Sequence, residues 1–289
     1  MKPRLPFLLT GLAVASINLA FAQAEHFRLP KVIEAGAGFS IQSNGNGKAK
    51  LYLIGPGQVL MRDVQLGEAT SLAPGSLCYA GRYLAVLAAE SFTETHSFDV
   101  VPASAPANLS FIAKPSRLPV GLHDGITGAV YVFDGYHNLI VTPKSVSFVL
   151  STPGGTMQKR TAVTNDGAAW TSMDSTAQQG IDNFVVRLGE LSSTRIVAQV
   201  PGDPCGLTMS ARQMGQRVQL ITDPVRDCNG NAVPDGTIVT FTARQGGTQS
   251  TIDEPLKHGI AEVTTQVQPG TTLSVASGVV MGNQIGWDK

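Results

Sequence analysis

The stretch VRDCNGNAVPDGTIVTFTARQGG, residues 225–247, joins a turn-rich half to a half that is typical of a β-strand. The dipeptides Asn229-Gly230 and Asp235-Gly236 supply the positive φ angles that tight turns need. Segment 237–242 is rich in β-branched and aromatic residues, as strands are. The stretch therefore predicts a strand connection followed by a strand, although its Asp, Asn and Cys residues also raise the question of a metal or redox site.

Similar strand signals recur along the whole chain, with Gly, Pro, Asn and Asp between them. Gly and Pro number 31 and 17, and charged residues make up only 15% of the chain. No window after the first two dozen residues has the spacing and caps of a helix. The pattern predicts an all-β protein built of sandwiches. The predicted strands include 50–54, 82–87, 145–150, 183–188, 217–221, 237–242 and 260–263.

An internal repeat links two parts of the chain. Asp134 and Asp227 are each followed by an Asn after four residues and by a Phe after fourteen. Two copies of one domain explain this spacing, and the Pro-rich segments 100–106 and 200–204 before them predict short, stiff linkers. The repeated motif consists of Asp134, Asn138, Phe148, Asp227, Asn231 and Phe241.

The repeat and the length predict tandem immunoglobulin-like β-sandwiches over residues 25–102, 103–201 and 202–289. The first of these lacks the Asp-to-Phe spacing but carries Tyr83 at the start of an apolar strand. Tyr83 is either a tyrosine corner, with its hydroxyl bonded to the backbone, or an ordinary core residue.

The first residues predict export. Lys2 and Arg4 precede an uncharged, mostly apolar run at 5–21, and small residues flank cleavage sites at 20–24, so residues 1–24 are interpreted as a signal peptide. Nothing later approaches the roughly 18 consecutive apolar residues that a membrane span needs. We expect a secreted, cell-surface or periplasmic protein with no transmembrane segment in the mature chain.

The motif V-x-D-x-x-G-N-x-V-P-D-G-T-x-V-T-F-T-A at 225–243 resembles the bacterial immunoglobulin-like group 1 (Big-1) domain of intimin- and invasin-type surface proteins. The resemblance is good in the last predicted domain and weaker in the one before it, where His137 and Leu139 interrupt the motif. It implies domains stacked as a stalk for cell adhesion. The family's membrane barrel and lectin-like tip are absent from this sequence, so its adhesion activity does not carry over automatically.

The Asp-rich loop departs from an EF-hand calcium loop. Asp227, Asn229 and Asn231 match its first ligand positions, but Ala232 and Ile238 stand where Gly and a bidentate Glu are required. Side chains that bond their own backbone in a turn are the favoured interpretation, and no metal or cofactor is predicted.

The chain has three cysteines. Cys205 and Cys228 fall within one predicted domain, and we expect them to form a disulfide, with two separate thiols as the alternative. Such a bond would contribute about 3 kcal/mol. Cys78 would then lie outside that disulfide.

Catalytic motifs are absent, so no enzyme activity and no catalytic residues are predicted. The five histidines are expected in loops or on solvated faces, although His123 with Asp124, or His137 with Asp134, could form a small polar cluster. Trp170 and Trp287 are sugar-stacking platforms or core residues, and the core interpretation is favoured.

The function hypothesis is a non-catalytic structural or adhesion module at the cell envelope. Lys plus Arg equals Asp plus Glu at 21 each, which offers no basic surface for nucleic acid. The alternative is a soluble periplasmic or secreted binding or assembly subunit, whose partner is an unidentified protein or a glycan. A strand exchanged with a partner is a further hypothesis, for which segment 274–285 resembles a long terminal strand. The sequence names no binding residues.

Overall fold

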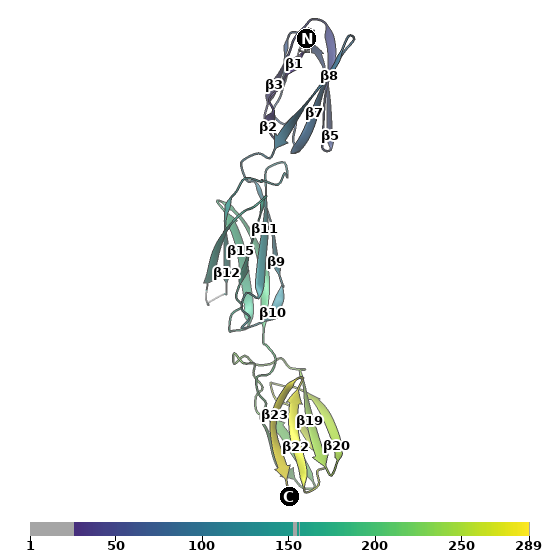
Figure 1. Cartoon of the computed structure of the whole chain (residues 1–289). Helices are drawn as coiled ribbons and strands as arrows, with labels where there is room; N and C mark the ends of the chain where they lie inside the picture. Colours follow the sequence, from purple (N-terminus) through teal and green to yellow (C-terminus); the bar gives the residue numbers. More distant parts are fainter. Residues whose placement is uncertain (1–25, 153–154, 156, 289) are drawn as a thin grey trace, which may run out of the picture. The chain divides into compact units, whose positions relative to one another are not determined.

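The computed structural model describes residues 26–152, 155 and 157–288. The predicted signal peptide, residues 1–24, lies outside this part of the chain. The described residues form strands, turns and loops without a helix, as the all-β prediction requires (Figure 1). They contain no helix that could span a membrane. The chain divides into two compact units, Met1–Val101 and Pro102–Lys289.

The described residues of the first unit form one β-sandwich around a hydrophobic cluster, called here the first sandwich. Side chains alternate between the core and the outside, so that Leu51 and Leu53 of one strand and Leu87 of its neighbour are fully buried. One sheet has the order β1 (Phe27–Arg28), β3 (Phe39–Ser43), β6 (Ala69–Leu72). The other has the order β2 (Val32–Glu34), β8 (Thr93–Val101), β7 (Gly81–Ala89), β4 (Lys48–Gly55), β5 (Gln58–Gln65).

Tyr83 takes the tyrosine-corner arrangement in this sandwich. Its ring is completely buried, and its hydroxyl donates to the Tyr79 carbonyl oxygen at 3.0 Å. Burial raises the pKa of the hydroxyl above its usual value. The ring lies against Gly55, where an added Cβ would come within 2.2 Å of it. The corner therefore requires glycine at this position.

The second unit contains two sandwiches, each with its own hydrophobic cluster. The second sandwich centres on Phe111, Phe148 and Phe184, whose rings contact one another. Its smaller sheet has the order β14 (Ala168–Met173), β11 (Ile126–Phe133), β9 (Asn108–Lys114). Its larger sheet has the order β10 (Arg117–Pro119), β16 (Leu191–Val200), β15 (Gly180–Leu188), β12 (Ser145–Ser151), β13 (Met157–Val163).

The third sandwich packs Phe241 and Trp287 into its core. Segment 274–285, predicted as one strand, is instead parts of two strands, because Gly278 and Val279 form a turn between them. One sheet has the order β17 (Met209–Met214), β18 (Arg217–Thr222), β21 (Glu262–Thr265). The other has the order β20 (Thr248–Pro255), β19 (Ile238–Gln245), β22 (Thr271–Ser277), β23 (Val280–Trp287).

Candidate functional site

The first copy of the repeated motif surrounds Asp134, which follows β11 and is fully buried. Its Oδ1 accepts the backbone N–H groups of Tyr136 and Asn138, both at 2.8 Å. Its Oδ2 accepts the Ala103 N–H and the Asn138 side-chain amide, both at 2.9 Å. The carboxylate thereby ties residue 103, in the segment before the sandwich, to the loop after β11.

The second copy has the same arrangement around Asp227. Its Oδ1 accepts the N–H groups of Asn229 at 2.9 Å and Asn231 at 2.8 Å. Its Oδ2 accepts the Gly202 N–H at 2.9 Å and the Asn231 amide at 3.0 Å. Phe148 and Phe241, the third residues of each motif, are buried core residues in β12 and β19. We call each Asp with its donors an Asp knot.

Hydrogen bonds keep the Asp carboxylate of each knot ionised. Burial alone would raise the pKa of Asp134 and Asp227, but the amide donors around each carboxylate outweigh it and hold both pKa values below the usual range. The oxygen atoms that a calcium ion would need already accept N–H groups. The turn interpretation of this loop therefore fits its geometry better than the calcium interpretation does.

A disulfide reinforces the second knot. Cys205 is bonded to Cys228, with 4.7 Å between the Cα atoms, and the Cys205 N–H donates to the Arg226 carbonyl oxygen at 2.9 Å. The linker is thus held covalently one residue from Asp227. The thiol of Cys78, in the first sandwich, instead donates to the Gly75 carbonyl oxygen at 3.2 Å.

Asn231 also connects the second and third sandwiches. Its amide donates to the Ala177 carbonyl oxygen at 2.9 Å, and its Oδ1 accepts the Gln179 N–H at 3.1 Å. The loop that carries these two residues is anchored by Gln199, whose Oε1 accepts the Thr176 N–H at 2.5 Å. One side chain therefore serves both the Asp knot and the contact between sandwiches, which we call the joint.

The joint is close-fitting and largely apolar at its rim. A Cβ added to Gly121 of the second sandwich would lie 2.6 Å from the Asn229 amide nitrogen of the third. A shallow hollow beside it is lined by Val120, Pro201, Pro204 and Cys228, among others. The sequence predicted the linker, but nothing in it indicated that Asn231 reaches loop 176–179.

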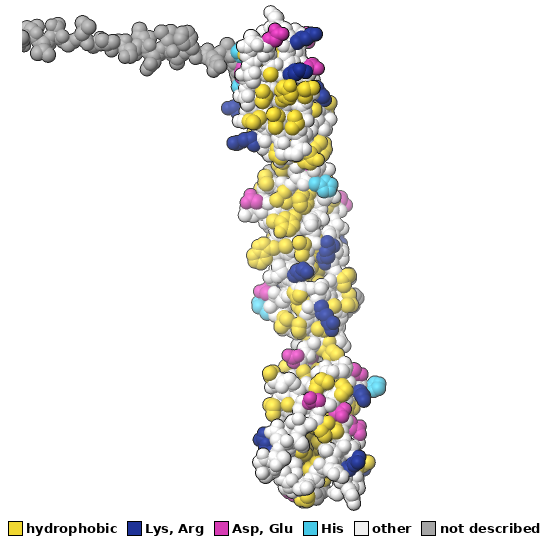
Figure 2. Space-filling view, turned by 90° about the vertical axis from the view of Figure 1, so that its right-hand side faces the viewer, with side chains coloured by type: hydrophobic (Ala, Val, Ile, Leu, Met, Phe, Trp, Pro, Cys, Tyr) yellow, Lys and Arg dark blue, Asp and Glu magenta, His cyan; other side chains and the backbone are white. Residues whose placement is uncertain are grey.

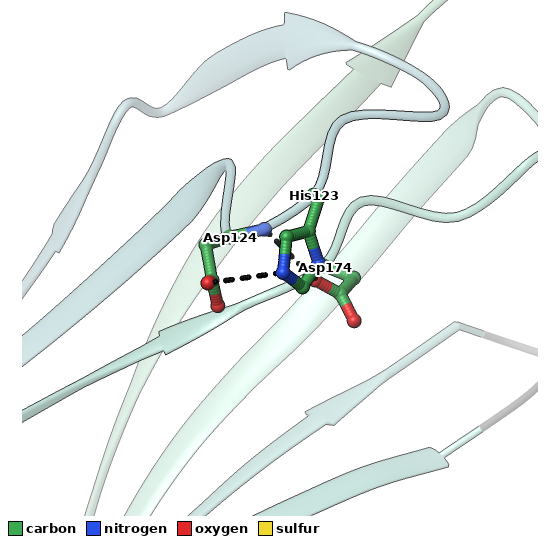
Figure 3. Close-up of side chains that lie close together, drawn as sticks. All are labelled: His123, Asp124 and Asp174. Carbon is green, nitrogen blue, oxygen red and sulfur yellow. Dashed lines mark hydrogen bonds and ion pairs between the residues drawn. The ribbon is translucent and has the colours of Figure 1, made fainter.

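A second polar cluster contains His123, Asp124 and Asp174 (Figure 3). His123 Nδ1 lies 2.7 Å from Asp174 Oδ1, and His123 Nε2 lies 3.3 Å from Asp124 Oδ2. The hydrogen bond from the Asp124 N–H lowers the pKa of Asp174 most, and His123 lowers it further. A guanidinium nitrogen of Arg160 lies 3.4 Å from Asp124 Oδ1. Its positive charge would repel a metal cation at this cluster. The cluster is exposed and forms its own ion pairs, and sequence reasoning missed Asp174.

Two expectations about single side chains need correction. Trp170 was expected in the core but is 70% exposed, because the alternation of β14 turns Ala169 and Met173 inward, whereas Trp287 is buried as expected. His96 was expected on a loop or a solvated face but is half-buried in β8, with Nε2 2.5 Å from Glu94 Oε1.

Around Trp170, the outer face of the smaller sheet is an aromatic surface. Trp170, Ala129 and Ile112 lie side by side across three strands, and Tyr131 is two residues from Ala129 on the central strand. Ile112 and Tyr131 are 45% and 39% exposed. We call these four residues the Trp170 surface.

Several solved structures align with this chain at low sequence identity. The crystal structure of invasin, a bacterial integrin-binding protein, aligns with a TM-score of 0.48 and 12% identity over 87% of this chain and 56% of the invasin chain. The FN1–FN3 domains of chicken CNTN1 align with a TM-score of 0.38 and 9% identity over 91% of this chain and 98% of theirs. This chain therefore spans little more than half of the invasin chain. No protein-family model and no curated protein matches the sequence.

Proposed function

We propose that the chain is an exported, non-catalytic tandem immunoglobulin-like protein that acts as a structural or adhesion module at the cell surface or outside the cell. The observation that carries this proposal is the pair of Asp knots, each of which holds the segment before a sandwich against that sandwich. Hydrogen bonds to an ionised carboxylate are about twice as strong as neutral ones. Strong local contacts of this kind suit a structural module.

The proposal includes the boundaries 25–102, 103–201 and 202–289, with a Big-1-like domain at 103–201 and a Big-1 domain at 202–289. Three separate hydrophobic clusters support it, since each cluster falls within one range. The two Asp knots support a common origin for the last two domains, because the same donors surround each carboxylate.

Fractionation of the native cells tests this function. Periplasm, outer membrane and medium are probed for the protein, and intact cells are treated with external protease. Cleavage on intact cells, or recovery from the medium, is expected. A protein confined to the periplasm and protected from protease would contradict the surface assignment and favour an assembly subunit inside the envelope.

A second candidate function is glycan binding by a secreted or periplasmic subunit, and the Trp170 surface favours it. Trp170 and Tyr131 lie on neighbouring strands and are both exposed, and the C–H face of a sugar can stack on such flat apolar rings. Ser110 and Ser172 on the same sheet add hydroxyl groups. Affinity electrophoresis in gels containing neutral polysaccharides tests this. Retardation that Trp170→Ala abolishes would support it, and equal migration of both proteins in every gel would contradict it.

A further inference from the structure

The outer face of the five-stranded sheet in the first sandwich is apolar where three strands meet. Across β5, β4 and β7, Val59, Ile54 and Leu84 form one row, and Met61, Tyr52 and Val86 form the next. Four of these side chains are between 41% and 67% exposed. Figure 2 shows hydrophobic side chains gathered on this sandwich with Lys and Arg around them. We call the six residues the apolar face.

The fold does not require an apolar surface at this position. In the third sandwich, β20, β19 and β22 occupy the same order as β5, β4 and β7. The row that corresponds to Met61, Tyr52 and Val86 there is Thr251, Thr242 and Ser274. Exposed apolar patches of this kind mark interaction surfaces in soluble proteins.

The outward side chains of the β4–β5 hairpin are complementary to a second copy of the same hairpin. Its outward cross-strand pairs are Ile54 with Val59, Tyr52 with Met61, and Lys50 with Asp63, and the last is an ion pair of 3.0 Å. A two-fold interface places residue i opposite residue j and residue j opposite residue i. A two-fold axis that runs parallel to the strands, between β4 and β5, therefore places the apolar pairs of one copy opposite those of the other. The same axis places Lys50 of each copy opposite Asp63 of the other.

We propose that the apolar face binds a second copy of this chain, hairpin over hairpin, with Lys50 of each copy opposite Asp63 of the other. β5 is the last strand in its sheet order, and no strand among the described residues pairs with its outer edge. In this arrangement Leu84 and Val86 of one copy lie beside that edge of the second copy. Two sheets stacked in this way pack about 10 Å apart with their strands roughly 30° from parallel. The inference is independent of the compartment in which the chain works.

The size of the surface predicts a weak dimer. Three strands of about eight residues cover roughly 26 by 14 Å, given about 3.3 Å per residue and 4.8 Å between strands. Covering such a surface on two copies removes roughly 700 Å² of sheet area from water, less than the roughly 1,000 Å² that a stable specific interface buries. We expect a dissociation constant in the micromolar range or above. Many copies held together on one surface would still associate, because their effective concentration is high.

Sedimentation equilibrium of residues 25–289 at about 10–500 μM, a range chosen for a weak interface, tests the proposal. A Cys78→Ser background without reductant prevents intermolecular disulfides through Cys78 and preserves the Cys205–Cys228 bond. Lys50→Asp sets Asp against Asp, and Asp63→Lys sets Lys against Lys, so each variant alone should dimerise at least about tenfold more weakly. Mixing the two variants restores both opposite-charge contacts and should restore dimers.

Met61→Lys, on the apolar face, should also abolish dimers, whereas the matched Thr251→Lys in the third sandwich should not. A chain that stays monomeric throughout the concentration range overturns the proposal. Dimers that are insensitive to Met61→Lys place the interface elsewhere and overturn it too. Failure of the mixed variants to associate would refute the hairpin register, and a monomer whose Met61→Lys variant loses cell attachment would indicate a different partner protein.

Discussion

The Asp knot depends on the chemistry of one carboxylate. Asp134 and Asp227 each have two oxygens that together accept backbone and side-chain N–H groups, and one of these donors belongs to the preceding segment. Asn in place of Asp would present one oxygen and one N–H group, so part of the donor set would face another donor. The acid, rather than its amide, is therefore required at both positions.

Replacing Asp227 by Ala should destabilise the third sandwich by about 2–4 kcal/mol, because several N–H groups lose the same charged acceptor together. Asp227→Asn should fall between this variant and the wild type. Urea unfolding measures both changes. Asp235→Ala is a suitable control, since Asp235 also accepts two N–H groups but lies on the exposed surface. Equal destabilisation by the Asp227 and Asp235 variants would contradict the role given to the knot.

The knots also predict a pH dependence. The folded state lowers the pKa of both Asp134 and Asp227 from the ordinary value of 3.8. Their contribution is therefore complete above that value and is lost as the pH falls from 3.8 through the folded-state pKa. Urea midpoints at pH 6 should differ more between wild type and Asp134→Asn/Asp227→Asn than midpoints near pH 3. A gap that stays constant with pH would show that ionisation is not involved.

At the scale of loops, the joint in the second unit depends on Asn231, whose side chain makes hydrogen bonds to both sandwiches. The carbonyl oxygen of Asn231 accepts the Gln179 N–H, and its amide donates both to Ala177 and to Asp227. A loop held only by its own sandwich would leave the Gln179 N–H without this acceptor. The joint is therefore a property of two loops, one from each sandwich.

Asn231→Ala should speed hydrogen exchange at the Gln179 amide about tenfold, because the loss of about 1.4 kcal/mol of protection corresponds to that factor. Exchange read residue by residue with NMR makes the measurement. Asn138→Ala removes the corresponding amide from the Asp134 knot and is the matched control, with unchanged exchange at Gln179 expected. If both variants speed that exchange equally, the contact between the loops is not what protects the amide.

The three hydrophobic clusters are separate. A substitution in one sandwich is therefore expected to change mainly the stability of that sandwich. Reducing the disulfide, or replacing Cys205 and Cys228 by Ser, should cost about 3 kcal/mol in the third sandwich. In a Trp170→Phe background, Trp287 is the single tryptophan and reports on that sandwich alone. Its fluorescence transition should move to lower urea. A parallel shift in hydrogen exchange of the first sandwich would contradict independent stability.

Much of the fold followed from short-range patterns. The alternation in 50–54 and 82–87 and the turn dipeptides around Gly230 and Gly236 predict strands and turns, because both depend on neighbours within a few residues. The Asp-to-Asn spacing of four residues likewise indicated a turn in which a side chain bonds its own backbone. The pairing of Cys205 with Cys228 could be expected because both fall within one domain-sized segment.

The remaining features arise where distant segments meet. Asp227 reaches Gly202 across 25 residues, and Asn231 reaches Ala177 across 54, so no local spacing encodes either contact. A strand pattern also does not say which face of the pleat is covered, and so Trp170 was placed in the core although β14 turns it outward. The apolar rows of the first sandwich exist only once register aligns Tyr52, Met61 and Val86 across three strands. Composition and periodicity dictate which segments become strands, whereas pairing register and the packing of layers decide which side chains meet and which remain exposed.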